Sequence, residues 1–150
     1  MEKVIEIRNL RKAYGDLVAV DDLSFSVGKG ELFAFLGVNG AGKSTTISII
    51  CKTLKKDGGK VYICGKDSDD DCRESARKIG VVFQYSALDK TLSVKDNLIS
   101  RAALYGIFGK AAEARIDELA EKLEFKPLLG VTLSKLSGGQ RRKIDVARAM

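Results

Sequence analysis

One glycine-rich stretch of the sequence combines residue types that can hold a phosphate group. The pattern G-x-x-x-x-G-K-S/T is matched by Gly37, Gly42, Lys43 and Ser44. The glycines let the backbone turn tightly and approach phosphate oxygens without a Cβ in the way. Lys43 supplies a cation for the β- and γ-phosphates, and Ser44 supplies a hydroxyl for Mg²⁺. The pattern predicts a loop that binds the triphosphate of a nucleotide, with MgATP as the expected ligand.

The residues on either side of this loop support the prediction. The short apolar run in residues 31–36 predicts a strand that is buried on both faces. Residues 43–54 place apolar side chains at three- and four-residue steps, which predicts a helix. A strand before the loop and a helix after it are what a phosphate loop requires, because the helix turns its positive N-terminal end toward the anion. A glycine-rich turn without a ligand is the disfavoured alternative.

A second glycine motif stands near the end of the sequence. Leu136-Ser137-Gly138-Gly139-Gln140 precedes three basic residues and an alanine-rich stretch that reads as a helix. Small residues and a serine hydroxyl at a helix N-terminus can bind an anion. Ser137 can equally be an ordinary N-cap of that helix. On these residues alone, both interpretations stay open.

Four motifs together resemble the ATP-binding cassette (ABC) ATPases. Residues 37–45 are similar to the Walker A loop of that family, and Leu136 to Gln140 to its signature sequence. Val81-Val82-Phe83-Gln84 resembles the Q-loop, and Tyr14 resembles the aromatic residue of the A-loop. The four occur in the family's order and cover nearly the whole chain. Residues 92–98 and Leu104-Tyr105-Gly106 look most like the drug-exporter-type subgroup of bacterial transporters.

The resemblance implies a role for each matching residue. Tyr14 would stack on adenine, with Val18 beside the ring. The phosphates would be wrapped by Asn39, Gly40, Ala41, Gly42, Lys43, Ser44 and Thr45. Lys43 and Gln84 would be the catalytic residues, and Ser44 and Gln84 would be the metal ligands. A nucleotide held by a second ABC domain would be bound by Ser137, Gly138, Gly139 and Gln140.

The resemblance also implies cofactors, partners and a location. ATP and Mg²⁺ would be the cofactors. The partners would be an integral-membrane permease subunit and a second ABC ATPase domain, in a homodimer or a heterodimer. The longer protein would hydrolyse ATP to ADP and phosphate to energise transport. It would lie in the cytoplasm, peripheral on the inner face of the cell membrane through the permease.

Other classes of protein share part of this pattern. An ABC ATPase that acts on DNA or ribosomes usually carries long insertions or a second cassette, and neither occurs in these 150 residues. A nucleotide-dependent regulatory module remains an alternative. An unrelated kinase or GTPase is disfavoured by the signature and Q-loop motifs, and the guanine-reading Asn-Lys-x-Asp of GTPases is absent from the sequence.

The sequence departs from the family pattern where the general base should be. No apolar strand ending in Asp-Glu follows Gln140, and the chain has no histidine. Asp117-Glu118 falls inside an amphipathic stretch instead. Phosphoryl transfer needs a positioned water, Mg²⁺ and a charge-stabilising shell. We therefore expect a chain truncated before the Walker B strand, which binds ATP weakly and hydrolyses it negligibly.

Hydrophobic periodicity predicts the elements that would position these motifs. Strands are predicted over residues 4–10, 17–27, 60–64 and 80–84, and helices over 69–78, 93–105, 110–124 and 137–150. The expected fold is α/β: a P-loop NTPase core with an N-terminal antiparallel β-subdomain and an α-helical subdomain. The expected division is residues 1–87 for the β-subdomain and P-loop core, 88–135 for the helical subdomain, and 136–150 for the signature motif and its helix.

Composition adds weaker constraints. The chain has 26 Lys and Arg against 20 Asp and Glu, giving a net charge of +6, and the basic residues are spread along it. This favours a solvated surface that attracts a polyanionic ligand over a nucleic-acid interface. No signal peptide and no membrane-spanning run are predicted. Cys51, Cys64 and Cys72 lack a CxxC spacing and are expected to be reduced thiols of a cytosolic protein.

Overall fold

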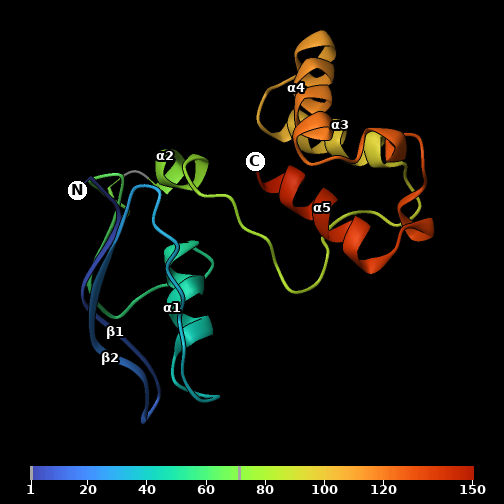
Figure 1. Ribbon diagram of the computed structural model, residues 1–150. Coiled ribbons are helices and arrows are strands. Elements are labelled where there is room, and N and C mark those ends of the chain that lie inside the picture. The colour runs from blue at the N-terminus through green and yellow to red at the C-terminus, as the bar shows by residue number, and fades with distance from the viewer. Residues whose placement is uncertain (1, 71) are drawn as a thin grey trace. The chain divides into compact units, whose positions relative to one another are not determined.

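The computed structural model describes residues 2–70 and 72–150, which form two compact units (Figure 1). The first unit is Met1–Ile79 and the second is Gly80–Met150. The first contains the sheet and the phosphate loop, and the second contains three of the helices. The predicted boundaries at residues 87 and 135 remain a prediction.

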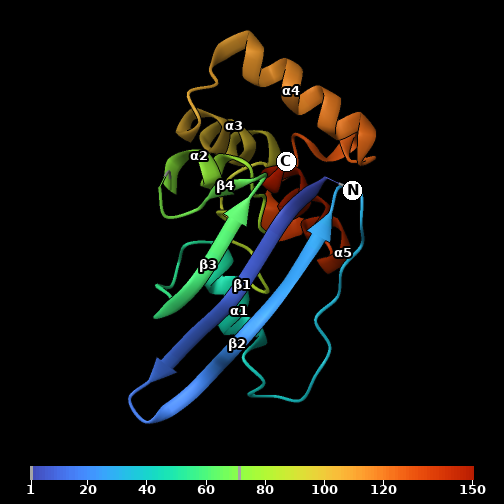
Figure 2. The same cartoon turned by 90° about the vertical axis from the view of Figure 1, so that its left-hand side faces the viewer.

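The first unit is built on an antiparallel sheet. Strand β1 (Lys3–Tyr14) and strand β2 (Leu17–Gly28) form a long hairpin, with β3 (Gly58–Ile63) on the other side of β1 and β4 (Lys66–Asp67) beyond it. Figure 2 shows these strands side by side. Helix α1 (Lys43–Ile50) packs its buried face on the sheet. The shared core consists of Ile7, Leu10, Val20, Ile49, Ile50, Val61 and Ile63.

Two predicted strands are wrong. Residues 31–36 and 80–84 are irregular, and Leu32 and Leu36 are 98% and 89% exposed. A strand buried on both faces needs a hydrogen-bonding neighbour on each side. The four strands of the described residues all belong to the antiparallel sheet, so they supply no such neighbour. Part of the apolar run at 31–36 packs instead as aromatics, with Phe33 stacked 4.9 Å from Phe25.

Helix α1 is shorter than predicted and stops at Ile50 instead of residue 54. Lys52 has a φ of 61°, a left-handed conformation that ends the helix. Helix α2 (Cys72–Arg77) lies within the predicted span of 69–78, of which Asp71 lies outside the described residues. Cys51 and Cys64 carry free thiols, and the side chain of Cys72 is not among those described.

The second unit is helical and has its own core. It contains α3 (Val94–Leu104), α4 (Gly109–Lys122) and α5 (Gly138–Ala149), with short 3-10 turns η1 (Lys126–Leu128) and η2 (Leu133–Lys135) between the last two. Phe125, Leu133 and Ile144 are fully buried at its centre. Ser93 caps α3 by accepting the Asp96 N–H at 3.1 Å, which confirms the predicted helix start.

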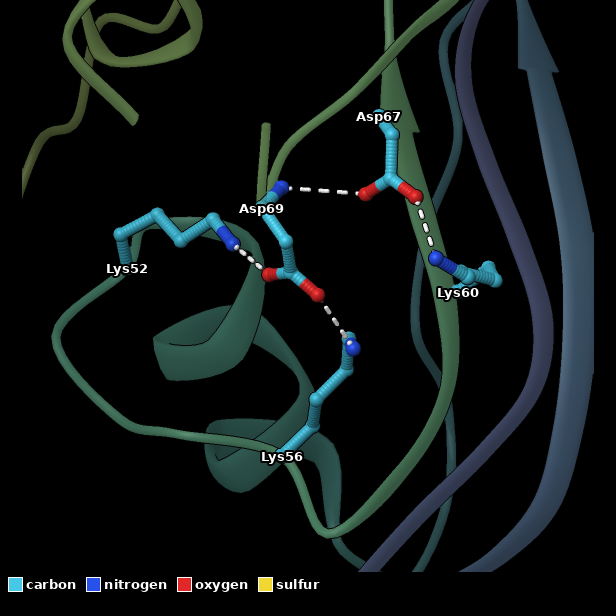
Figure 3. Close-up of polar contacts among 5 residues, drawn as sticks. All are labelled: Lys52, Lys56, Lys60, Asp67 and Asp69. Atoms are coloured by element: carbon cyan, nitrogen blue, oxygen red, sulfur yellow. Dashed lines mark hydrogen bonds and ion pairs between the residues drawn. The ribbon is translucent and has the colours of Figure 1, made fainter. Parts of the chain in front are cut away.

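A carboxylate ties the end of α1 to the segment that follows β4. Asp69 accepts from Lys52 at 2.5 Å and from Lys56 at 2.6 Å, and its N–H donates to Asp67 at 3.0 Å (Figure 3). Asp67 is in turn paired with Lys60 at 2.7 Å. The ammonium of Lys52, followed by that of Lys56, lowers the pKa of Asp69 from 3.8 to about 2.

This pairing predicts a pH-dependent contribution to stability. Because the pKa of Asp69 is lower in the folded chain, its stabilisation is complete above about pH 4 and is lost as the pH falls toward 2. Asp69→Asn should lower the free energy of unfolding by about 1 kcal/mol at pH 7, because water screens a carboxylate that is 44% exposed. Urea unfolding followed by circular dichroism at several pH values measures the difference.

The matched control is Asp16→Asn, since the carboxylate of Asp16 has no hydrogen bond or ion pair with any residue described. The difference between wild type and Asp69→Asn should shrink between pH 4 and pH 2. A difference that stays constant over this range would show that the carboxylate is not responsible.

Candidate functional site

The phosphate loop, residues 37–45, is held directly against strand β2. Gly42, the residue before α1, has a φ of 74°. A Cβ on Gly42 would lie 2.3 Å from the carbonyl oxygen of Ala19 and 2.9 Å from Cγ2 of Val20. Both the left-handed backbone and the close approach exclude a side chain at this position. Gly42 therefore fixes where the loop enters α1.

The start of α1 presents backbone donors without acceptors. The Thr46 N–H donates to the Gly42 carbonyl at 2.8 Å, but the N–H groups of residues 42–45 meet no acceptor within the described part of the chain. The first turn contains no acidic side chain, and no side chain caps the helix. The helix dipole adds partial positive charge at the same end. This end of α1 is therefore suited to an anion.

The ammonium of Lys43 bonds back to the first residues of the phosphate loop. Its Nζ donates to the carbonyl oxygens of Gly37 and Val38, each at 2.6 Å. An ammonium has three donors, so one remains for a phosphate oxygen. These two hydrogen bonds tie the start of the loop to its end and keep the positive charge of Lys43 beside the loop backbone.

The three hydroxyl residues after Lys43 divide into two kinds. Ser44 is exposed and Thr45 half-buried, and neither hydroxyl has a hydrogen-bond partner among the residues described. Thr46 is fully buried, and its Oγ1 donates to the Gly42 carbonyl at 2.9 Å. Ser44 is therefore available to a ligand, whereas Thr46 supports Gly42. The role of Thr46 was not predicted from the sequence, although the run Ser44-Thr45-Thr46 is a visible signal.

These groups fit the phosphates of MgATP. The loop offers backbone N–H groups, an ammonium and hydroxyls, and none of its described residues is acidic. The described residues include no group of three or more His, Cys, Asp or Glu side chains able to hold a metal alone. Mg²⁺ usually takes few protein ligands together with substrate phosphates. Ser44 would hold the ion jointly with the nucleotide, and Lys43 would neutralise phosphate charge.

Tyr14 and Val18 lie at the tip of the β1–β2 hairpin. Tyr14 pairs with Leu17 and Ala13 pairs with Val18 across the two strands. The Tyr14 side chain is 48% exposed, so its ring can still receive a flat base. Val18 directly precedes Ala19 and Val20, the two residues of β2 that Gly42 approaches. The hairpin tip and the phosphate loop thus belong to one packed unit.

A carboxylate whose role was not predicted from the sequence holds this tip of the hairpin. Asp57 accepts the Ala13 N–H and the Lys12 ammonium, both at 2.8 Å. The Ala13 N–H, followed by Lys12, lowers the pKa of Asp57. The same ammonium lies 5.4 Å from the centre of the Tyr14 ring. No local pattern predicts a pairing over 45 residues, because it exists only once β3 has joined the sheet.

Gln84 belongs to the second unit and does not end a strand. Residues 80–83 are irregular, and the Gln84 side chain is exposed with no hydrogen bond to a described residue. The amide is therefore free to bind a ligand. Its assignment to Mg²⁺ or to the attacking water stays a prediction.

The second glycine motif forms the start of α5. The Ser137 Oγ accepts the Gln140 N–H at 3.2 Å, and the Gln140 Oε1 accepts the Ser137 N–H at 2.9 Å. This reciprocal capping box confirms Ser137 as an N-cap. A Cβ on Gly138 or Gly139 would meet nothing within 4 Å. Nothing in the described residues therefore requires either glycine, and binding of a phosphate there remains a prediction.

The predicted site residues fall into two groups. Tyr14, Val18 and residues 39–45 lie in the first unit, where the packing of Gly42 on β2 brings them together. Gln84 and residues 137–140 lie in the second unit.

Sequence comparisons find one family and several relatives. The profile of the family described as "ABC transporter" matches residues 20–150. Nod factor export ATP-binding protein I of Burkholderia orbicola is 36% identical over 146 residues, which are 97% of this chain and 48% of that protein. The protein of the same name from Bradyrhizobium diazoefficiens is also 36% identical, with the same coverage. The chain thus spans about half the length of the curated relatives it matches.

Solved structures share the fold. The structure of cbiO1 from Clostridium perfringens, part of the ABC transporter complex cbiONQ, matches with a TM-score of 0.87 and 25% identity, over 99% of this chain and 61% of that one. An ATP-binding cassette of an ABC transporter in its ADP conformation matches with a TM-score of 0.85 and 28% identity, over 99% and 65%. These matches confirm the predicted α/β fold, with an antiparallel sheet and helices.

The packing of Gly42 predicts a difference between two glycines of the same loop. Gly42→Ala should lower the free energy of unfolding by about 3 kcal/mol, because both backbone strain and the contact with Ala19 oppose a Cβ. Gly40 also has a positive φ, but a Cβ there would meet nothing within 4 Å. Gly40→Ala should therefore cost only about 1 kcal/mol. Urea unfolding measures both, and equal losses would contradict the close approach of loop and strand.

Proposed function

The chain belongs to the ABC transporter family, and from this membership we propose that it is the ATP-binding part of a membrane exporter. Export is proposed because the curated relatives compared above are named as export ATP-binding proteins. The run at residues 92–98 and Leu104-Tyr105-Gly106 supports placing it in the drug-exporter-type subgroup. The Nod factor in the relatives' names is their cargo, and the residues of this chain give no reason to transfer it.

One observation carries the proposal of ATP binding. Unpaired N–H groups, the Lys43 ammonium and the Ser44 hydroxyl converge at the start of α1, and Gly42 holds them against the strand that leads to Val18. Donors of this kind recognise the phosphates and Mg²⁺. Tyr14 and Val18 at the hairpin tip would recognise adenine. The combination favours ATP over an inorganic anion.

A second ABC domain is the first proposed partner. Gly138 and Gly139 have open space around them and no positive φ, so no contact among the described residues explains them. Glycines with this freedom suit close approach by a ligand from outside the chain. We assign that ligand to the nucleotide of a second ABC domain, identical or different, bound by Ser137, Gly138, Gly139 and Gln140.

A permease is the second proposed partner. Among the described residues, no helix has the length and hydrophobicity to cross a membrane. In the proposed assembly the permease forms the path for the cargo, and this chain contacts it at the inner face of the membrane. ATP-driven dimerisation and hydrolysis in the whole protein would then energise transport.

The catalytic roles proposed for this chain concern charge rather than proton transfer. Lys43 would stabilise negative charge on the transferred phosphoryl group, and Gln84 would orient water or Mg²⁺. Neither of these roles is that of a general base. The only adjacent Asp-Glu pair, Asp117-Glu118, lies on α4, where Glu118 is ion-paired with Arg115. It does not follow a strand and is not a candidate for the base.

The first test of this proposal is the dependence of nucleotide binding on Lys43. Lys43→Ala should weaken the affinity for MgATP roughly thirtyfold in isothermal titration calorimetry, because a charge-assisted hydrogen bond is lost. The control is Lys55→Ala, which removes the same charge from an exposed lysine of the same unit without a described partner. Equal effects of the two changes would reduce the role of Lys43 to general attraction of an anion.

A second test concerns turnover. The 150-residue chain should release phosphate from MgATP no faster than its Lys43→Ala variant, because the described phosphate loop contains no carboxylate that could activate water. A phosphate-release assay at saturating MgATP measures this. Lys43-dependent release at a rate typical of complete enzymes would contradict the proposed division between binding and catalysis.

Binding of MgATP without release of phosphate also fits the alternative of a nucleotide-dependent regulatory module. Co-purification with a permease would distinguish the transporter subunit from that alternative.

A further inference from the structure

Side chains of α5 fasten the segment that carries Gln84. The Arg142 guanidinium donates to the carbonyl oxygen of Phe83 at 2.6 Å. Arg148 donates to the carbonyl oxygen of Val81 at 3.1 Å. Both bonds link residues more than 50 positions apart and both use backbone acceptors, so they hold the path of the chain itself.

A buried carboxylate on the same helix makes a third link. Asp145 is only 4% exposed and accepts the Ser86 hydroxyl at 2.8 Å. The Ser86 oxygen also accepts the Leu88 N–H at 3.3 Å. A buried carboxylate is costly without a hydrogen bond, so the pair with Ser86 is a strong constraint on this segment.

The segment also touches α5 at its first residue. A Cβ on Gly80 would lie 2.2 Å from the carbonyl oxygen of Ala149, so the two backbones are in direct contact. Figure 1 draws the segment in yellow-green beside the red helix α5. Residues 80–86 are therefore held at four points, which lie on both sides of Gln84: Gly80, Val81, Phe83 and Ser86.

The helix has two faces with different tasks. Ile144 and Ala147 are buried in the core of the second unit. Arg142, Asp145 and Arg148 follow one another at three-residue steps, which places them along one side of the helix. This polar side, which we call the arginine side, grips residues 81–86. The N-terminal end of the same helix carries Ser137 and Gln140.

We propose that Arg142, Asp145 and Arg148 are positioning residues that make Gln84 move together with the start of α5. The backbone on both sides of Gln84 is fastened, whereas its amide is free. A ligand that displaces Ser137–Gln140 would therefore displace Gln84 through the body of the helix. The inference rests on the proposed function in giving Gln84 its role toward Mg²⁺ or water, but the fastening itself does not depend on nucleotide.

A single fluorophore can report on this segment. The chain has no tryptophan, and Tyr85 is 81% exposed beside Gln84, so Tyr85→Trp introduces one indole at the right place. Time-resolved anisotropy of the 150-residue chain gives the fraction of that indole with fast local motion. Adding Arg142→Ala should raise this fraction about fivefold, because one charge-assisted hydrogen bond to the segment is lost. Arg142→Lys should restore most of the fastening, since an ammonium can still donate.

Arg141→Ala is the matched control. Arg141 is the next residue on α5 and has no side-chain partner among those described, so its loss should leave the fast fraction unchanged. Circular dichroism confirms that each variant is folded. Equal fast fractions in the Arg141→Ala and Arg142→Ala variants would overturn the proposal.

The coupling to the start of α5 is tested by a double-mutant cycle. Ser137→Ala removes the cap and should raise the fast fraction while Arg142 is present, but add little in the Arg142→Ala background. Independent effects of the two changes on the fast fraction would overturn the coupling.

Titration of the Tyr85→Trp chain with MgATP separates this result from the proposed function. If Arg142→Ala raises the fast fraction but MgATP does not change it, the positioning by Arg142 is supported and the role of Gln84 toward the nucleotide is contradicted.

Discussion

The close contact between Gly42 and strand β2 is the constraint on which the candidate site depends. It sets the left-handed step that begins α1, and so determines where the free N–H groups of residues 42–45 face. It also joins the phosphate loop to the strand that carries Val18, whose partner strand ends at Tyr14. A substitution that pushed loop and strand apart would separate the donors for phosphate from the platform for adenine. Thr46 stabilises this arrangement, because both its N–H and its hydroxyl donate to the Gly42 carbonyl.

Lysines of the first unit differ in whether a carboxylate or a carbonyl oxygen is their partner. Lys12, Lys52 and Lys56 are each paired with a carboxylate, Lys12 with Asp57 and the other two with Asp69. Lys43 is different, because its partners are carbonyl oxygens, which orient the ammonium without neutralising it. Lys55 also has no carboxylate partner among the described residues, so what distinguishes Lys43 is that carbonyl oxygens hold its ammonium at the phosphate loop. The positive charge of Lys43 therefore stays beside the start of α1.

Features determined by neighbouring residues were predictable from the sequence. The caps at Ser93 and Ser137, the glycine-rich loop and the hairpin depend on residues close in sequence, and the structure contains each of them. Features that need distant partners were not predictable. The apolar runs at 31–36 and 80–84 have strand composition, but a strand requires neighbours that the described residues do not supply. The anchoring of the hairpin tip by Asp57 and the grip of α5 on residues 81–86 likewise appear only in the folded chain.

Recognition of both the phosphates and the base of ATP is proposed to lie in a single packed unit. Nitrogen–proton correlation spectra of the labelled chain, titrated first with magnesium tripolyphosphate and then with MgATP, test it most directly. Tripolyphosphate should shift the amides of residues 40–45, and MgATP should shift these and also residues near Tyr14 and Val18. The claim would be contradicted if the amides of residues 40–45 stayed in place with both ligands, or if the hairpin tip responded equally to a ligand without a base.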